Sequence, residues 1–191
     1  MTIDHKEIII LAAQKRFAQH GYSKVTMDEI AADICTSKSA LYYHFADKDE
    51  IFKEVLLLEQ KEFFKQAKHL LKQEGSAQER LRRYFKLRID LITRLQNLGA
   101  IDSGTPKEIR PALRSLFSEF VAKDRAVIVQ ILSLGADKEF VPDRLDAIAD
   151  LISHVFHGLR LRQRSLEIPI EQFSTEIMLL ADVVLNGVVR R

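Results

Sequence analysis

The chain has 191 residues, of which 47% are hydrophobic and 29% are charged, with seven glycines, four prolines and a formal net charge of +2. This composition excludes a disordered chain and a collagen-like repeat, and the few glycines and prolines favour long helices. The single cysteine, Cys35, excludes an internal disulfide, and the longest strictly apolar run, Ile8 to Ala13, is too short to cross a bilayer. Because the amino end also shows no signal peptide, we expect a cytoplasmic protein without a membrane partner.

Three helices are predicted before residue 48. The first covers about residues 4–20, where apolar side chains recur every three or four positions. The second is short and ends near residue 34; it begins at Thr26, which has Glu29 at the spacing of a capping box. After a break of about three residues, a third helix covers residues 38–45.

Longer helices are predicted after this point. Asp47 and Glu50 repeat the capping-box spacing, so a long helix is expected over residues 48–73. The helix that follows it has one apolar face and is expected to end at Gly99.

Pro111 is expected to break or kink the chain before another long helix. The last two helices are predicted at about residues 143–164 and 170–189. Their apolar faces are wider than packing against one core requires, which predicts a subunit interface. The chain is therefore predicted to be all-α.

The two short helices, with the first helix to support them, have the arrangement of a helix-turn-helix. The second short helix carries small donors and a cation at its amino end, and side chains with hydrogen-bonding tips on its outward face. These candidates are Ser37, Lys38, Ser39, Tyr42, Tyr43 and His44. Leu41 and Phe45 share the inward face. A purely structural three-helix unit is the alternative, but two adjacent exposed tyrosines favour binding of a partner.

A group of residues around this helix carries a family resemblance. The group is the run 37–45 with Lys48, Glu50 and Ile51 after it, and Ala12, Ala13, Phe17, Gly21 and Tyr22 before it. It resembles the DNA-binding signature of the tetracycline-repressor (TetR) family of transcriptional regulators, specifically over about residues 5–55. The resemblance implies a helix-turn-helix domain at residues 1–47, joined by a long helix to a larger helical domain at residues 48–191. This larger domain is expected to bind an effector and to form a homodimer through the last two helices.

The same resemblance implies a homodimeric repressor of a palindromic DNA operator, released by a small effector. It implies phosphate contacts from Thr26, Tyr42, Tyr43, His44 and Lys48, with Lys38, Ser39 and Ala40 nearest the base edges. Two positions depart from the family pattern. Cys35 stands where the family commonly has glycine and must accept an unusual backbone conformation or shift the turn slightly. Thr36 stands where the family is usually apolar.

The larger domain is expected to hold an effector pocket lined mainly by apolar and aromatic side chains. The candidates are Phe64, Tyr84, Phe85, Arg88, Phe117, Phe120, His154 and Phe156, each of which is also explained as a core residue. Eleven phenylalanines and no tryptophan favour an apolar effector, such as an acyl chain or an aromatic compound.

Other functions find less support in the sequence. A redox-sensor role for Cys35 lacks a resolving cysteine in the chain, and a metal site at His154 and His157 lacks further ligands at suitable spacing. We therefore expect no metal and no cofactor. An enzyme is not expected, because no phosphate-binding loop or nucleophile elbow is present. A helical carrier or adaptor remains the alternative, and it predicts weak, sequence-independent DNA affinity.

Overall fold

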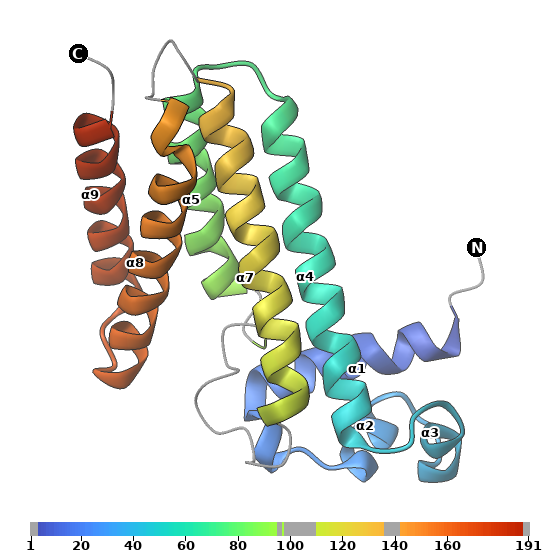
Figure 1. Cartoon of the computed structure of the whole chain (residues 1–191). Coiled ribbons are helices and arrows are strands. Elements are labelled where there is room, and N and C mark those ends of the chain that lie inside the picture. Colours follow the sequence, from blue (N-terminus) through green and yellow to red (C-terminus); the bar gives the residue numbers. More distant parts are fainter. Residues whose placement is uncertain (1–3, 95–96, 98–109, 136–141, 189–191) are drawn as a thin grey trace. The chain divides into compact units, whose positions relative to one another are not determined.

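The computed structural model describes residues 4–94, 97, 110–135 and 142–188 (Figure 1). Every regular element in these ranges is a helix, which confirms the predicted all-α class. Among the described residues, no helix has the length and apolar character needed to span a membrane.

The chain divides into two compact units. Unit 1 contains residues 1–63 and 94–116, and unit 2 contains residues 64–93 and 117–191. The chain passes between the units at three places, and each lies inside a helix: α4 (Lys48–Lys72), α5 (Ala77–Arg94) and α7 (Arg110–Ser133). The predicted division after residue 47 stays a prediction, since residues 48–63 belong to the same compact unit as residues 1–47.

Unit 1 begins with a helix, a short 3-10 turn and two short helices. They are α1 (His5–His20), η1 (Tyr22–Lys24), α2 (Met27–Asp33) and α3 (Lys38–His44). The predicted capping box is present, because the Thr26 hydroxyl accepts from the Glu29 amide at 3.3 Å while the Glu29 carboxylate accepts from the Thr26 amide at 2.8 Å. The second predicted start is also confirmed: Asp47 accepts from the Glu50 amide at 2.8 Å, next to the first residue of α4.

The core of unit 1 lies under α3. Leu41 and Phe45, predicted to face inward, are almost completely buried. They share the core with buried residues of the other elements, among them Ile9, Ala13, Phe17, Ile30, Ile51, Phe52 and Val55. The rings of Phe17 and Phe52 meet edge to face with centroids 5.0 Å apart, which joins α1 to α4.

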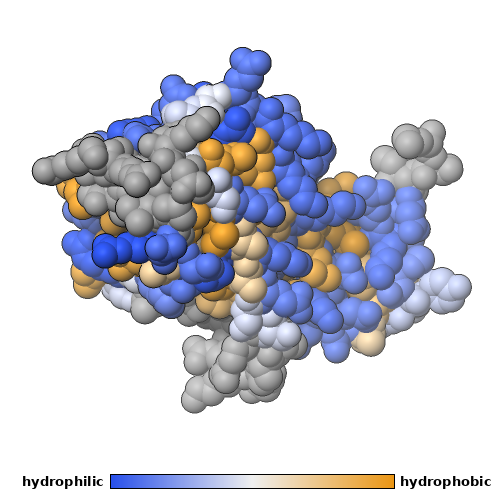
Figure 2. Space-filling model, turned by 45° about the horizontal axis from the view of Figure 1, so that its top comes forward, coloured by the Kyte–Doolittle hydropathy of each residue, from blue (hydrophilic) through white to orange (hydrophobic). Residues whose placement is uncertain are grey.

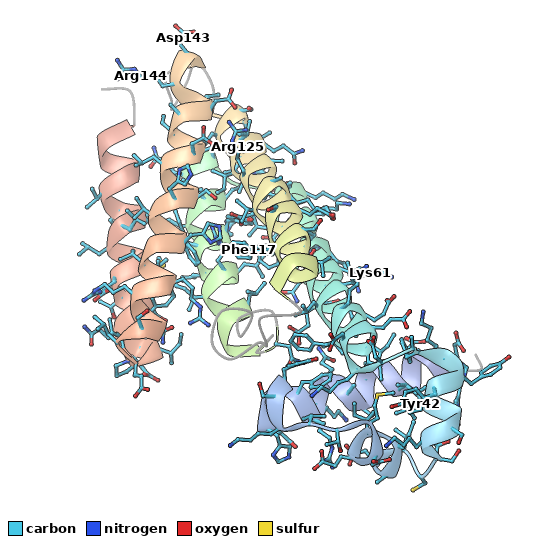
Figure 3. The ribbon with its side chains drawn as sticks, turned by 60° about the horizontal axis from the view of Figure 1, so that its bottom comes forward. Tyr42, Lys61, Phe117, Arg125, Asp143 and Arg144 are labelled. Carbon is cyan, nitrogen blue, oxygen red and sulfur yellow. The ribbon has the colours of Figure 1, made fainter. Side chains whose placement is uncertain are left out.

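Unit 2 contains four more elements and the main part of α7. They are α5 (Ala77–Arg94), η2 (Pro142–Arg144), α8 (Leu145–Ser165) and α9 (Ile170–Val188). α8 and α9 lie side by side (Figure 1). Arg125 near the end of α7 pairs with Asp146 and Asp150 of α8, the former at 2.7 Å (Figure 3).

Two predicted helix limits change, and a third is not tested. α5 is described to Arg94, and the expected end at Gly99 lies outside the described residues. α7 begins at Arg110 and takes Pro111 into its first turn, where the missing N–H of proline removes no helical hydrogen bond. α8 begins at Leu145, because residues 142–144 form a 3-10 turn.

The surface is mainly polar in the view of Figure 2, where hydrophobic residues form separate patches between hydrophilic ones. The large hydrophobic side chains that are most exposed include Tyr43, Leu134, Leu151, Leu166, Leu179 and Val183. Single exposed residues of this kind are ordinary, but adjacent ones indicate contact with a partner.

Phe45→Ala should destabilise the protein by about 3–5 kcal/mol, because it removes a large, fully buried ring from beneath α3. Tyr43→Ala is the matched control on the same helix, since this ring is 86% exposed and its loss should cost less than about 0.5 kcal/mol. Urea unfolding followed by circular dichroism measures both. Equal effects of the two substitutions would contradict the assignment of inner and outer faces.

Candidate functional site

The turn between α2 and α3 sets the direction of α3. Cys35 adopts φ 52°, the left-handed region in which glycine is favoured, so the expectation of an unusual backbone at this residue is confirmed. The turn is closed by backbone hydrogen bonds: the amides of Cys35 and Thr36 donate to the carbonyls of Ala32 and Ala31 at 3.1 and 3.0 Å. The Cys35 thiol is exposed.

The outward face of α3 carries the predicted reading residues. Tyr42 is 48% exposed and Tyr43 is 86% exposed, and Ser39 is exposed between them and the start of the helix (Figure 3). His44 is half-buried, with its ring 5.5 Å from that of His5 and 5.1 Å from that of Tyr43. The Ser37 hydroxyl caps the helix by accepting from the Ala40 amide at 3.2 Å.

Lys38 is the cation at the start of α3, and it is paired with an acidic residue of α2. Its ammonium donates to the Asp28 carboxylate at 2.8 Å, and both side chains are largely exposed. The hydrogen bond to Asp28 raises the pKa of Lys38 above its ordinary value. A phosphate or a base edge must therefore compete with Asp28 for this cation.

Lys48 lies at the start of α4, with its ammonium turned toward the backbone of unit 1. It donates to the carbonyls of Tyr22 and Val25 at 3.0 and 2.7 Å and lies 4.3 Å from the centre of the Tyr22 ring. Desolvation by burial lowers the pKa of Lys48 below its ordinary value. This side chain therefore fastens the start of α4 to the segment before α2.

Thr26 is also committed to local structure, since its hydroxyl donates to the Glu29 carboxylate at 2.9 Å in addition to accepting from the Glu29 amide. Asp28 was not predicted, and Tyr22 was named only as part of the family signature. They are the partners of Lys38 and Lys48, respectively. Neither pairing has a local sequence signal, because a turn separates Asp28 from Lys38, and α2 and α3 separate Tyr22 from Lys48.

The predicted effector residues are brought together only in part. Five of the eight candidates are buried within unit 2: Tyr84, Phe85 and Arg88 of α5, Phe120 of α7 and Phe156 of α8. Phe64 is half-buried with its ring 5.4 Å from that of Phe120, and Phe117 lies 5.4 Å from the ring of His157 on α8 (Figure 3). His154 does not join this group, because it is exposed on α8.

A buried ionic contact lies among these aromatic side chains. Arg88 and Asp124 are 3% and 0% exposed, and their Nη1 and Oδ2 atoms are 2.9 Å apart. The Tyr84 hydroxyl donates to the other oxygen of Asp124 at 2.6 Å, and the Arg88 guanidinium lies 3.5 Å from the centre of the Phe156 ring. Ser153 is buried one turn before Phe156 on α8. We call Tyr84, Arg88, Asp124 and Ser153 the buried polar centre.

Asp124 and Ser153 were not found from the sequence. Asp124 lies between Lys123 and Arg125 in the sequence, where a carboxylate is expected on the solvent face of a helix, and Ser153 lies next to His154, so neither is marked as a buried polar residue by the local pattern. A separate surface hollow of about 490 Å³ is lined by α4 and α5 and contains none of the predicted residues. Its lining is Lys65, Gln66, His69, Leu70, Gln73 and Leu87.

In the part of the chain that the structure describes, no three His, Cys, Asp or Glu side chains are grouped to hold a metal.

Comparison with known proteins agrees with this geometry. Residues 9–55 match the model of the bacterial regulatory proteins of the tetR family. A solved transcriptional regulator from Cytophaga hutchinsonii is 30% identical, with a TM-score of 0.86 over 96% of this chain and 98% of that chain. The chain belongs to the TetR family of bacterial regulatory proteins. In this TetR-family chain, α2 and α3 are the helix-turn-helix, and the rest is the larger helical domain of that fold.

Curated relatives of this TetR-family chain are similar over a shorter stretch. The regulator YhgD of Bacillus subtilis is 42% identical over 55 residues, which is 29% of each chain. The regulator QacR of Staphylococcus aureus is 36% identical over 63 residues, or 33% of this chain and 34% of QacR. The matched stretch therefore spans about a third or less of either relative.

Asp28→Asn should tighten binding to a DNA duplex by about threefold at low salt, because it frees Lys38 and removes a negative charge beside the reading helix. The gain should shrink as added salt screens the exposed charges. Fluorescence anisotropy of a labelled duplex measures it. Asp143→Asn, an equal change of net charge at an exposed residue of unit 2, is the control, and an equal gain from it would show that Lys38 does not face DNA.

Proposed function

We propose that this protein is a homodimeric repressor that binds a palindromic operator through α3 and is released from it by a small effector. Residues 1–47 form the DNA-binding domain, and residues 48–191 form the domain that binds the effector and makes the dimer. The observation that carries the proposal is the outward face of α3, where Tyr42 and Tyr43 are exposed on a helix whose inner face is buried. Adjacent exposed aromatic rings are unfavourable in water unless a partner covers them.

The predicted DNA contacts divide into two kinds. The first kind has side chains at the surface, which contact DNA through side-chain atoms: Lys38, Ser39, Tyr42 and Tyr43. The rest of the α3 surface is made by Ala40 and His44. The polar side-chain atoms of Thr26, Ser37 and Lys48 are engaged within unit 1. We propose that these three residues act mainly by holding the helix starts, whose free amide groups then face phosphates.

The dimer is proposed to form through α8 and α9. Leu151 on α8 and Leu179 and Val183 on α9 are each more than half exposed. Gly158 lies two turns after Leu151 on the same face, and a Cβ atom built there would have no neighbour within 4 Å. Glycine in a helix costs about 1 kcal/mol relative to alanine, so a glycine on this apolar face supports close approach of a partner helix.

The effector is proposed to bind among the buried aromatic residues of unit 2 and to act through α4. Its binding would shift α4 and change the separation of the two α3 helices of the dimer. The effector must bind one separation more tightly than the other, and a coupling of about 1–3 kcal/mol is typical of such switches.

Selection of bound fragments from a genomic library, followed by anisotropy on the best fragment, tests the proposal. One inverted repeat should be enriched, and Tyr43→Ala should weaken its binding at least about tenfold, because the ring is lost from the reading face. Leu134→Ala, at an exposed apolar residue of unit 2, is the control and should bind as the wild type does. Equal, weak binding of all sequences by wild type and variant would instead favour a helical carrier or adaptor.

Gly158→Arg should convert the dimer to a monomer, because the new side chain would meet the partner helix, while the helix content is unchanged. Ala122→Arg, at an exposed position of α7, adds the same side chain elsewhere and should leave the dimer intact. Light scattering after size exclusion measures the oligomeric state, and circular dichroism measures the helix content. A dimeric Gly158→Arg variant, or a monomeric wild type, would contradict the proposed interface.

A further inference from the structure

The buried polar centre holds more hydrogen-bond donors than acceptors. A guanidinium carries five N–H groups, and that of Arg88 is almost completely buried. Its contact with Asp124 has the distance of an ion pair but not the angles of a hydrogen bond, and its flat face lies on the Phe156 ring. The buried Ser153 hydroxyl likewise makes no hydrogen bond with any residue that the structure describes.

Asp124 supplies the two carboxylate oxygens of the centre, and one of them accepts from the Tyr84 hydroxyl at 2.6 Å. The other, Oδ2, lies 2.9 Å from Arg88 Nη1 in the ion pair and, like that nitrogen, makes no hydrogen bond with any residue that the structure describes, so one carboxylate oxygen faces the five N–H groups of Arg88. Burial, reinforced by the charge of Asp124, holds the pKa of Tyr84 well above its ordinary value, so this phenol keeps its proton and remains a donor. Buried donors without acceptors are costly, and a site that leaves them open is suited to a ligand that brings an acceptor.

From this imbalance we propose that the effector is an apolar molecule carrying an uncharged carbonyl oxygen, which accepts hydrogen bonds from Arg88 and Ser153. The apolar part of the molecule contacts the aromatic rings around the centre, including Phe120 and Phe156. The inference rests on the proposed function, since it names the class of effector for the same effector domain.

The charge of the centre favours a neutral acceptor over an anion or a cation. Asp124 already balances the charge of Arg88, so a carboxylate effector would add an uncompensated negative charge in a buried place. An amine would bring more donors and would place a second positive charge beside Arg88. Ketones, esters, lactones and amides supply the missing acceptor oxygen without adding a negative or a positive charge to the buried centre.

Two matched series of probes test this class on the full-length protein. The first is decan-2-one, decanoate and decylamine, and the second is 4-phenylbutan-2-one, 4-phenylbutanoate and 4-phenylbutylamine. Calorimetric titration and the midpoint of thermal unfolding measure binding. In at least one series the ketone should bind about tenfold or more tightly than its acid and its amine.

Variants assign that preference to the proposed donors. Ser153→Ala should weaken ketone binding about three- to tenfold, while the unfolding midpoint of the free protein stays the same or rises, because the lost hydroxyl makes no hydrogen bond there. Ser174→Ala is the control: its hydroxyl donates to the Ile170 carbonyl at 2.7 Å, so its loss should leave ketone affinity unchanged. Arg88→Lys keeps a charge opposite Asp124 but removes the planar donor group, and should weaken ketone binding more than tenfold.

Tighter binding of the acids or amines, equal binding of all three head groups, or no binding in either series would overturn the inference. So would an unchanged ketone affinity in Ser153→Ala. Operator binding is measured in the same samples by anisotropy. A protein that binds its operator but shows no preference for the ketones refutes this inference alone, whereas a wild-type protein without specific DNA binding refutes the proposed function.

Discussion

Because α3 has only seven residues, far fewer than a helix needs to be stable alone in water, its position depends on the burial of Leu41 and Phe45 beneath it. The same burial decides what faces outward. With Leu41 on the inner side, the two tyrosines that follow it must point to the surface. The left-handed conformation of Cys35 then fixes the angle at which the helix leaves the turn. The surface that reads DNA in the proposed function is thus a consequence of hydrophobic packing on its other side.

Net charge alone does not account for DNA binding by the first fifty residues. Residues 1–50 contain six Lys or Arg and eight Asp or Glu, so their formal net charge is 6 − 8 = −2. Several of the acidic groups are paired: Arg16 binds Asp33 and lies 3.5 Å from Glu29, and Lys38 binds Asp28. Affinity for a polyanion must therefore come from local placement, which means the exposed end of α3 and the amide groups at helix starts.

Among the residues of unit 2 whose burial the structure describes, the core is apolar except for the buried polar centre, and that exception is costly to the fold. A buried ion pair gains little over apolar packing of the same volume, and an unpaired hydroxyl such as that of Ser153 is a net loss. Stability therefore does not explain why these groups are there, and the proposed effector with an acceptor oxygen gives them a role. Arg125, which pairs with Asp146 and Asp150 at the surface, is the opposite case, because its partners satisfy it without burial.

The sequence by itself determined the features that depend on neighbours within one helical turn. The Thr26–Glu29 capping box, the cap from Asp47 to the Glu50 amide and the inner and outer faces of α3 were predicted, since residues three or four positions apart decide them. The unusual backbone at Cys35 was expected from the family resemblance, in which glycine is common at this position. Only the tertiary structure decided where the polar side chains turn. Lys48 reaches carbonyls 26 and 23 residues away, and Tyr84 meets Asp124 across 40 residues. Such pairs form because packing of separate helices brings them together, and no local pattern in the sequence records that packing.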